Sequence, residues 1–411
     1  MPSAAYSLQR TLPLITPDPE LAMVLGIVSS FQEADSTVDP VDIINLYISL
    51  KSKPLAVLVG PGNQGKLAAI RILSDQVIGR SAQVQMMVGH PFWASKSTNV
   101  ALFTEAQTRF NTEKVLSLIE EAWEPKNTSR LYLGCLARIS FAELESFFTS
   151  AAFQLGHGEL MALPYAHFNE PVPFPPNLLL VGTMDTYPTN WFRSALLTQA
   201  SIIYWSNSHP LQADFLKPTA VPVRRQAEFL RRRVRKFRPA RLKLSRIIGW
   251  DLPGLEPVKE ILRLLDDHSV FLPAHVAEDI VIYLANAWSR DDVGLFSVSN
   301  KENLDTALDF AVTQSLLPHV FLTEAGQYSS WDALIGVLQE HFPRAHALVH
   351  SIPTEQQVER WSEVGIDPVC GMAVDQEHAA GASEYEGASY HFCSLICKQT
   401  FDLNPGKYIE R

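Results

Sequence analysis

A short apolar run at residues 55–59, Leu-Ala-Val-Leu-Val, leads directly into a glycine-rich turn and then into an apolar stretch with helical spacing at residues 67–73. A continuous apolar run of this length is typical of a strand that is buried on both faces, as in a parallel sheet. A strand, a glycine turn and a helix N-terminus in this order can cradle a phosphate group with backbone N–H groups. The segment therefore predicts a parallel α/β core with an anion-binding turn.

The turn reads Gly60-Pro61-Gly62-Asn63-Gln64-Gly65-Lys66-Leu67 and fits every position of a phosphate loop except the last. Lys66 is expected to reach the outer phosphates of ATP or another nucleotide. The last position normally holds Ser or Thr, whose hydroxyl binds magnesium. Leu67 has no such oxygen, so the loop is expected to lack its magnesium ligand. A glycine turn without a ligand is the alternative interpretation.

Further apolar segments with strand character follow and alternate with helical patterns, at residues 84–88, 131–133, 178–181 and 202–205. This alternation predicts a mainly parallel sheet with helices on both faces. Residues 21–31 and 115–123 are expected to be helical, and residues 252–350 to form a separate helical subdomain. The predicted organisation is an N-terminal segment (1–40), a core (41–215), a basic helix with a helical lid (216–350), a linker (351–364) and a C-terminal module (365–411).

Residues 40–325 resemble the AAA+ ATPases, specifically the McrB/MoxR-like branch. The segment Val-Gly-Thr-Met-Asp at residues 181–185 looks like the sensor 1 strand of that branch, with Asp185 where an Asn is usual. Leu196 and Leu197 match the position before its arginine finger, and residues 304–318 resemble a segment of its helical lid. The resemblance implies nucleotide binding at residues 60–67 with Asp185 close by, and assembly into a homo- or hetero-oligomer such as a ring.

The catalytic positions of that family are replaced in this chain. Gly134 and Cys135 stand where the second acidic motif has Asp-Glu, and residues 198–200 read Thr-Gln-Ala where the finger arginine is expected. Phosphoryl transfer depends on positioned charges and metal ions. We therefore expect little or no hydrolysis and no catalytic residues, which describes a pseudo-ATPase. An active ATPase that uses substitute ligands such as Asp185 is the alternative.

Twelve Lys or Arg residues lie between residues 217 and 246, with Glu228 as the only acid, although the whole chain has a net charge of −10. On a helix over residues 224–238 an apolar stripe would be buried and the arginines would spread over the remaining surface; the stripe consists of Ala227, Leu230, Val234 and Phe237. Such a surface is suited to nucleic acid or an acidic protein. A solvated face or a layer of salt bridges between subunits is the alternative.

Three of the four cysteines lie within 28 residues near the C-terminus: Cys370, Cys393 and Cys397. Cys393 and Cys397 are four apart, which places both on one face of a helix. Cys370 precedes Gly371, which permits a tight turn. Thiolates in this pattern are suited to zinc, copper or iron. Reduced thiols in a small core are the alternative.

This C-terminal segment resembles the YHS domain, a small metal-binding module. The resemblance rests on Asp-Pro-Val-Cys-Gly-Met at residues 367–372, the turn at 384–387, Tyr-His-Phe-Cys-Ser at 390–394, the second cysteine of the helix and Phe-Asp-Leu-Asn-Pro at 401–405. It implies that Cys370, Cys393 and Cys397 bind a transition metal. The fourth ligand is then His391, a water or a partner molecule.

Without a signal peptide or a long apolar run, the chain is expected to be cytoplasmic and to lack a membrane span. The combined prediction is a regulatory or scaffolding pseudo-ATPase with a metal-binding module. An active translocase and a metal sensor or carrier are the alternatives.

Overall fold

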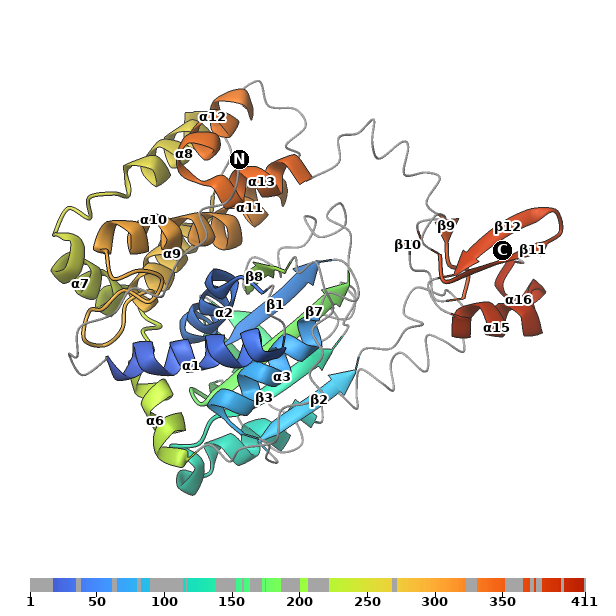
Figure 1. The fold of residues 1–411 in the computed structure, drawn as a ribbon, viewed down its shortest axis with the longest axis horizontal. Helices are drawn as coiled ribbons and strands as arrows, with labels where there is room; N and C mark the ends of the chain where they lie inside the picture. Colours follow the sequence, from blue (N-terminus) through green and yellow to red (C-terminus); the bar gives the residue numbers. More distant parts are fainter. Residues whose placement is uncertain are drawn as a thin grey trace.

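The computed structural model describes residues 18–34, 38–60, 65–79, 83–88, 114–115, 117–137, 153–156, 159–162, 172–173, 175–185, 200–205, 222–267, 272–322, 331–351, 365–369, 373–374, 379–392 and 395–409. The predicted mixed α/β class is confirmed, with a five-stranded parallel sheet and, near the C-terminus, a small antiparallel sheet (Figure 1).

The parallel sheet consists of five apolar strands in the order β2-β3-β7-β1-β8. Their bounds are β1 Leu55–Gly60, β2 Val84–Val88, β3 Tyr132–Ala137, β7 Leu178–Asp185 and β8 Ser201–Tyr204. All four neighbouring pairs are parallel. Each strand overlaps a predicted strand segment, because continuous apolar runs suit a sheet that is covered on both faces.

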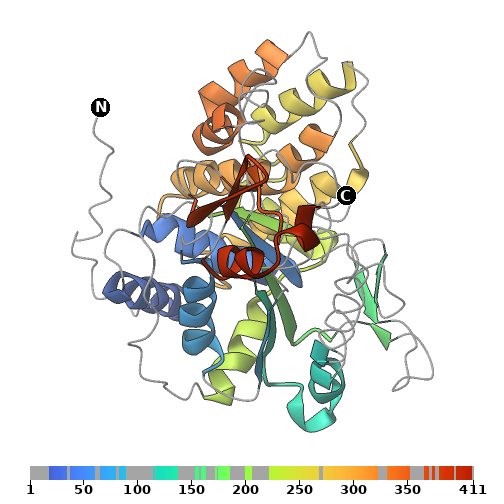
Figure 2. The ribbon, with the colours of Figure 1, turned by 90° about the vertical axis from the view of Figure 1, so that its right-hand side faces the viewer.

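Helices cover both faces of this sheet (Figure 2). On one face lie α1 (Pro19–Ala34), α2 (Pro40–Ser52) and α3 (Lys66–Val77). The helix at residues 114–115 and 117–123 covers the other face, where Leu118 approaches Gly134 of β3. Right-handed crossovers explain why helices lie on both faces. The chain crosses the sheet in one direction from β1 to β2 and in the opposite direction from β2 through β3 and β7 to β8, so the connecting helices lie on opposite faces.

Residues 222–351 form a mainly helical segment in the described structure, and most of its helices lie above the sheet in Figure 1, whereas the first lies beside the sheet. Its helices are α6 Val223–Arg232, α7 Phe237–Ile248, α8 Glu256–Asp267, α9 Ala274–Asn286, α10 Asn300–Ala311, α11 Leu317–Leu322, α12 Trp331–His341 and α13 Pro343–Ser351, with a π-helical turn at Val312–Leu316. Residues from these helices and from the sheet share one continuous apolar core. The predicted boundary near residue 215 therefore does not separate two independent apolar cores among the described residues.

The predicted single helix over residues 224–238 is wrong. The structure has two helices, α6 and α7, joined by a segment in which Arg233 is extended, with φ −76° and ψ 137°. Val234 exchanges two hydrogen bonds with the side chain of Asn286, at 3.0 and 2.7 Å. Pro239 lies in the first turn of α7, where a missing N–H costs nothing, but it would break a helix that continued through it.

The predicted buried stripe is also wrong by one position. Gln226 and Phe229 are the buried residues of α6, whereas Ala227, Leu230, Val234 and Phe237 are only half-buried. Gln226 accepts hydrogen bonds from the Leu131 backbone N–H, at 2.8 Å, and from the Gln83 side chain, at 3.0 Å. These bonds stabilise a polar side chain in the interior, where hydropathy alone would have placed it at the surface.

The C-terminal module is built from two hairpin-like pairs and two short helices. Its elements are β9 Gly365–Ile366, β10 Ala373–Val374, β11 Gly381–Tyr385, β12 Ala388–Phe392, α15 Leu395–Leu403 and α16 Gly406–Ile409. The module has its own small core around Phe401, whose ring centre lies 5.1 Å from those of Tyr390 and Phe392. Outside this module, a three-stranded antiparallel sheet contains β4 Phe153–Gly156, β5 Glu159–Ala162 and β6 Val172–Pro173.

We found no candidate membrane span in the described parts of the chain, since no helix there is both long and apolar enough to cross a bilayer.

Candidate functional site

The phosphate-loop segment begins at the carboxyl end of β1 and ends at the first residue of α3. Gly65 is the N-cap of α3 and has φ 74° and ψ 16°, a left-handed conformation that favours glycine. Glycine offers no side-chain cap, and the backbone N–H groups of a helix N-terminus are suited to bind an anion. Lys66 is 4% exposed, and its Nζ donates a hydrogen bond to the Gly60 carbonyl oxygen at 3.0 Å.

The other predicted nucleotide-site residues are only partly placed. Leu67 is half-buried and packs against the core. Asp185 is the last residue of β7 and lies in register with Gly60 of β1, so its backbone adjoins the start of the loop. Pro61, Gly62, Asn63 and Gln64 lie outside the described residues, as do Leu196, Leu197, Thr198 and Gln199. Ala200 is buried just before β8.

Gly134 and Cys135 lie inside β3 and not at its carboxyl end. Both are buried, and they pair in register with Leu180 and Val181 of β7. A Cβ atom at Gly134 would lie 2.8 Å from Leu180 Cδ2, so any side chain there requires its neighbours to move. Burial raises the pKa of the Cys135 thiol to about 12. Neither position offers a carboxylate or a thiolate for phosphoryl transfer.

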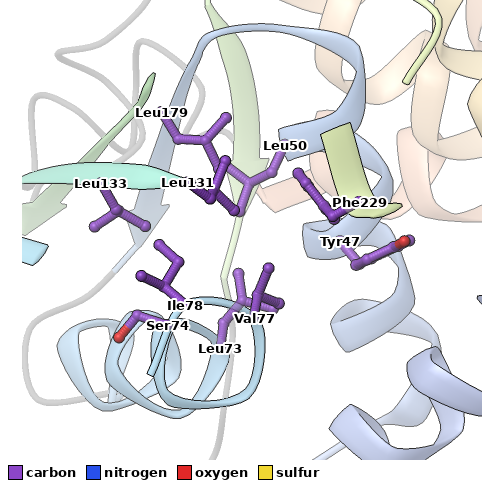
Figure 3. Close-up of a pocket in the computed structure, with 10 residues that line it drawn as sticks. All are labelled: Tyr47, Leu50, Leu73, Ser74, Val77, Ile78, Leu131, Leu133, Leu179 and Phe229. Atoms are coloured by element: carbon purple, nitrogen blue, oxygen red, sulfur yellow. The ribbon is translucent and has the colours of Figure 1, made fainter. Parts of the chain in front are cut away.

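An apolar cavity lies elsewhere, between the sheet, α3 and the neighbouring helices (Figure 3). Leu131 and Leu179 line it from the amino ends of β3 and β7, and the predicted phosphate loop follows the carboxyl end of β1, at the other end of the strands. Its remaining lining is apolar apart from Ser74 and Tyr47. Such a space has the character of a packing defect and offers few polar groups to orient a ligand.

The basic stretch is divided between surface and interior. Arg224, Arg225, Arg231, Lys236, Arg238 and Arg241 are exposed. The side chain of Arg232 is only 8% exposed and lies 3.2 Å from Glu228. Arg233 donates to the Pro176 carbonyl, and burial lowers the pKa of Arg235 to about 10. The prediction that the arginines spread over a solvated face therefore holds for only part of the stretch.

In the C-terminal module, a buried carboxylate shapes the segment before Cys370. Asp367 is fully buried, and its Oδ1 accepts a hydrogen bond from the Val369 N–H at 2.9 Å, which forms an Asx turn. The expected turn at residues 384–387 is present, with positive φ at Glu386 and Gly387. Sequence reasoning gave Asp367 no role, although Asp before Pro is a known turn signal.

One of the three predicted thiol ligands is described. Cys397 lies on α15 and is buried in the same small core as Val369 and Phe392. Val369 directly precedes Cys370, and Phe392 directly precedes Cys393; these two cysteines lie outside the described residues. Within the described residues, no group of three or more His, Cys, Asp or Glu side chains is arranged to hold a metal ion.

His391 lies on β12 between Tyr390 and Phe392, whose rings face Phe401 of α15. Successive side chains of a strand point to opposite faces. His391 is therefore on the hairpin face that points away from α15 and Cys397. A role of His391 as the fourth ligand stays a prediction, as do the alternatives of a water or a partner molecule.

Comparison with known proteins identifies the C-terminal module. Residues 365–411 match the YHS domain family. The resemblance found in the sequence is thus confirmed for this segment, and YHS domains are associated with metal binding. No curated protein sequence matches the chain. The AAA+ resemblance of residues 40–325 remains a prediction.

Proposed function

We propose that this protein is a non-catalytic regulatory or scaffolding protein, in which a nucleotide-binding type of core carries a metal-binding YHS module. The observation that carries the proposal is the geometry at Gly60, Gly65 and Lys66 together with a strand of the same sheet, β3, whose described residues, Tyr132–Ala137, include no acidic side chain.

The topology of the sheet supports the nucleotide part of the proposal. In open α/β sheets, ligands bind outside the carboxyl ends of the strands, where the strand order reverses. Here the chain leaves β1 for the distant strand β2 and later crosses from β7 to β8 on the other side of β1. The end of β1 is therefore the expected ligand position, and the N-terminus of α3, with Gly65 as its N-cap, lies there.

The same site lacks the groups for hydrolysis. Leu67 replaces the hydroxyl that binds magnesium, and it packs against the core. β3 ends with Leu136 and Ala137, so the described carboxyl end of this strand has no carboxylate. These departures agree with a degenerate AAA+ protein that binds nucleotide without turnover, alone or in a ring with other subunits.

The packing of the YHS module supports a shared thiol site. The residues that precede Cys370 and Cys393 pack in one core with Cys397. Cys370 and Cys393 directly follow these residues in the sequence, and we propose that their thiols bind the same metal ion as Cys397. Thiolate ligands favour zinc, copper(I) or iron. The module then serves as a metal-responsive element attached to the core.

Nucleotide binding is the first test. We would measure equilibrium binding of ATP to the full chain with and without magnesium, using Lys66→Ala as the test variant and Lys259→Ala, an exposed lysine of α8, as the matched control. The proposal expects magnesium-independent binding that weakens at least about tenfold, or about 1.4 kcal/mol, only in Lys66→Ala. Magnesium-dependent turnover that Lys66→Ala abolishes would establish the active-ATPase alternative instead.

Metal binding is the second test. We would determine bound metal after expression and after reconstitution with zinc, using Cys397→Ser as the test variant and Cys135→Ser as the matched control, because Cys135 is a buried thiol in the core. The proposal expects one thiol-bound metal per chain that only Cys397→Ser removes. Equal metal content in all three proteins would contradict it. If metal binding persists while ATP binding is absent, the metal sensor or carrier is the better interpretation.

A further inference from the structure

A pair of histidines on α13 brings two ring nitrogens together at the surface. His346 and His350 are four residues apart, and their Nε2 atoms form a hydrogen bond of 2.9 Å, which a shared metal ion would replace. Residues with this spacing share one helix face, and two histidines so placed are the metal ligands of helical zinc sites. From this geometry we propose that His346 and His350 form a second transition-metal site, separate from the thiols of the YHS module.

The orientation of the two rings fits a shared metal ion. Their centroids are 4.3 Å apart, and the ring planes are inclined by 74°. If the two rings met end to end in one line, the distance between their centroids would exceed the distance between their Nε2 atoms by a whole ring width. The observed separations differ by less than that, so the two rings meet at an angle and not end to end.

The distance between the nitrogens selects a class of metal. With metal–nitrogen bonds of about 2.0–2.1 Å, nitrogens that lie 2.9 Å apart subtend about 90° at the metal. A tetrahedral zinc ion would need a separation of about 3.4 Å. Angles near 90° are typical of the square-planar or tetragonal sites of copper(II) and nickel(II), which imidazole ligands suit. Water molecules would complete the coordination.

The helix holds the pair in place. Ala345 and Val349, the neighbours of the two histidines, are buried against the core. At the start of α13, the Asp309 carboxylate accepts hydrogen bonds from the N–H groups of Arg344 and Ala345, at 2.9 and 3.1 Å. A site on an anchored helix loses little conformational freedom when it binds a metal.

The histidine pair also lies close to the YHS module in sequence. α13 ends at Ser351, and the module begins at residue 365. The two sites differ in chemistry, because imidazole suits copper(II) and nickel(II), whereas thiolates suit copper(I) and zinc. The chain would then carry two sites that prefer different metal ions, one on each side of the linker between Ser351 and residue 365.

Nickel(II) titration of a thiol-free chain tests this inference independently of the proposed function. We would use the full-length chain with Cys370→Ser, Cys393→Ser and Cys397→Ser, stripped of metal, and measure binding by calorimetry. We expect one nickel(II) ion per chain, bound at least about tenfold more weakly after His346→Ala or His350→Ala. His341→Ala, which removes a partly exposed histidine of the neighbouring helix α12, is the control and should bind as the parent does.

Copper(II) electron paramagnetic resonance on the same proteins reports the ligands directly. Coupling to two nitrogens is expected in the parent and the control, and its loss in either histidine variant. Alanine is a good helix former, so these variants should keep α13, which circular dichroism checks. Absence of saturable nickel(II) binding, or binding that neither histidine substitution changes, would overturn the inference.

Discussion

The ammonium group of Lys66 donates a hydrogen bond of 3.0 Å to the carbonyl oxygen of Gly60, which joins the first residue of α3 to the last residue of β1. The same ammonium is expected to contact a bound phosphate. An ammonium group has three N–H donors, so it can donate to a phosphate and keep its bond to Gly60, which would hold the ammonium at the end of β1.

Replacement of Lys66 should lower stability even without a ligand. The lysine is buried, and its bond to Gly60 involves a charged donor. Hydrogen bonds to charged groups contribute about 1.5–3 kcal/mol, so we expect Lys66→Ala to lower the free energy of unfolding by about that amount. Urea denaturation measures the change. Stability equal to that of the parent would mean that the bond contributes little in solution.

Restoring an acid in β3 should not restore hydrolysis. A Cβ atom at position 134 would approach Leu180 Cδ2 to 2.8 Å and Met87 Cε to 3.1 Å, inside a buried strand. Gly134→Asp therefore inserts a carboxylate where there is neither space nor solvent, and we expect it to destabilise the fold by at least about 3 kcal/mol. Thermal unfolding and a phosphate-release assay check both parts. A stable variant with new ATPase activity would contradict the non-catalytic proposal.

The buried ion pair between Lys51 and Glu20 is expected to be important for stability as a pair. The two charged atoms are 2.6 Å apart, and both side chains are at most 1% exposed. Removal of one partner leaves an uncompensated buried charge, which costs about 3–5 kcal/mol. Glu20→Gln should show that loss in urea denaturation, whereas Glu20→Gln combined with Lys51→Met should recover much of it. Equal losses in the single and double variants would contradict the coupling.

Gln226 should be more important for stability than its sequence position suggests. Its Nε2 donates to the Ile78 carbonyl at 3.0 Å, and its Oε1 accepts from the Leu131 N–H. Gln226→Leu leaves both buried backbone groups without that partner, at about 1–3 kcal/mol each. Ala227→Leu, at the half-buried neighbouring position, is the control and should cost much less. Chemical denaturation of the two variants provides the comparison.

His319 should make stability depend on pH. Burial, with the charges of His275 and Lys53, lowers its pKa to about 4 in the folded chain, against 6.5 for an exposed histidine. Between these values the unfolded chain binds the extra proton, so stability falls as pH decreases from about 6.5 to 4. The parent should lose stability at low pH and His319→Gln should not lose it for this reason. Relative to the parent, His319→Gln should therefore be more stable at about pH 4.5 than at about pH 7.5.

Asp42 and Asp309 act in the opposite direction, because burial raises their pKa values to about 6. As pH falls, these carboxyls bind protons in the folded chain before they do so in the unfolded chain. Their contribution to the free energy of unfolding therefore increases as pH falls from about 6 to 4. Both are present in the parent and in His319→Gln, so the difference between the two proteins isolates the histidine. A stability difference that is constant across this pH range would show that His319 does not titrate in the folded chain as its burial indicates.

Local apolar runs were sufficient to predict the sheet. The range 84–88 coincides with β2, and the other four strands were predicted within a few residues because each is buried on both faces. The break between α6 and α7 was not predictable from hydropathy, since Asn286, more than 50 residues away, supplies the hydrogen bonds that hold Val234 extended. Pro239 was the one local signal of this break.

The thiol module was predictable because its spacing is specific, and the family match confirms it. The position of His391 was not, because the choice of hairpin face depends on which neighbours pack against Phe401. The pair of His346 and His350 is visible as a spacing in the sequence, but the spacing alone gives neither the 2.9 Å separation nor the anchored helix that carries it.

Asn286 has a mechanical consequence beyond the break that it stabilises. The side-chain amide of Asn286 bonds to the Val234 backbone between α6 and α7 and also donates to Ser52 Oγ at the end of α2. Lys51 of α2 donates to the backbone carbonyl oxygen of Asn286 at 3.2 Å. Three parts of the chain are thereby fastened at one buried residue. Movement of α9 relative to α2 or to the link between α6 and α7 would have to break these bonds together, so we expect these three parts of the chain to move as one unit.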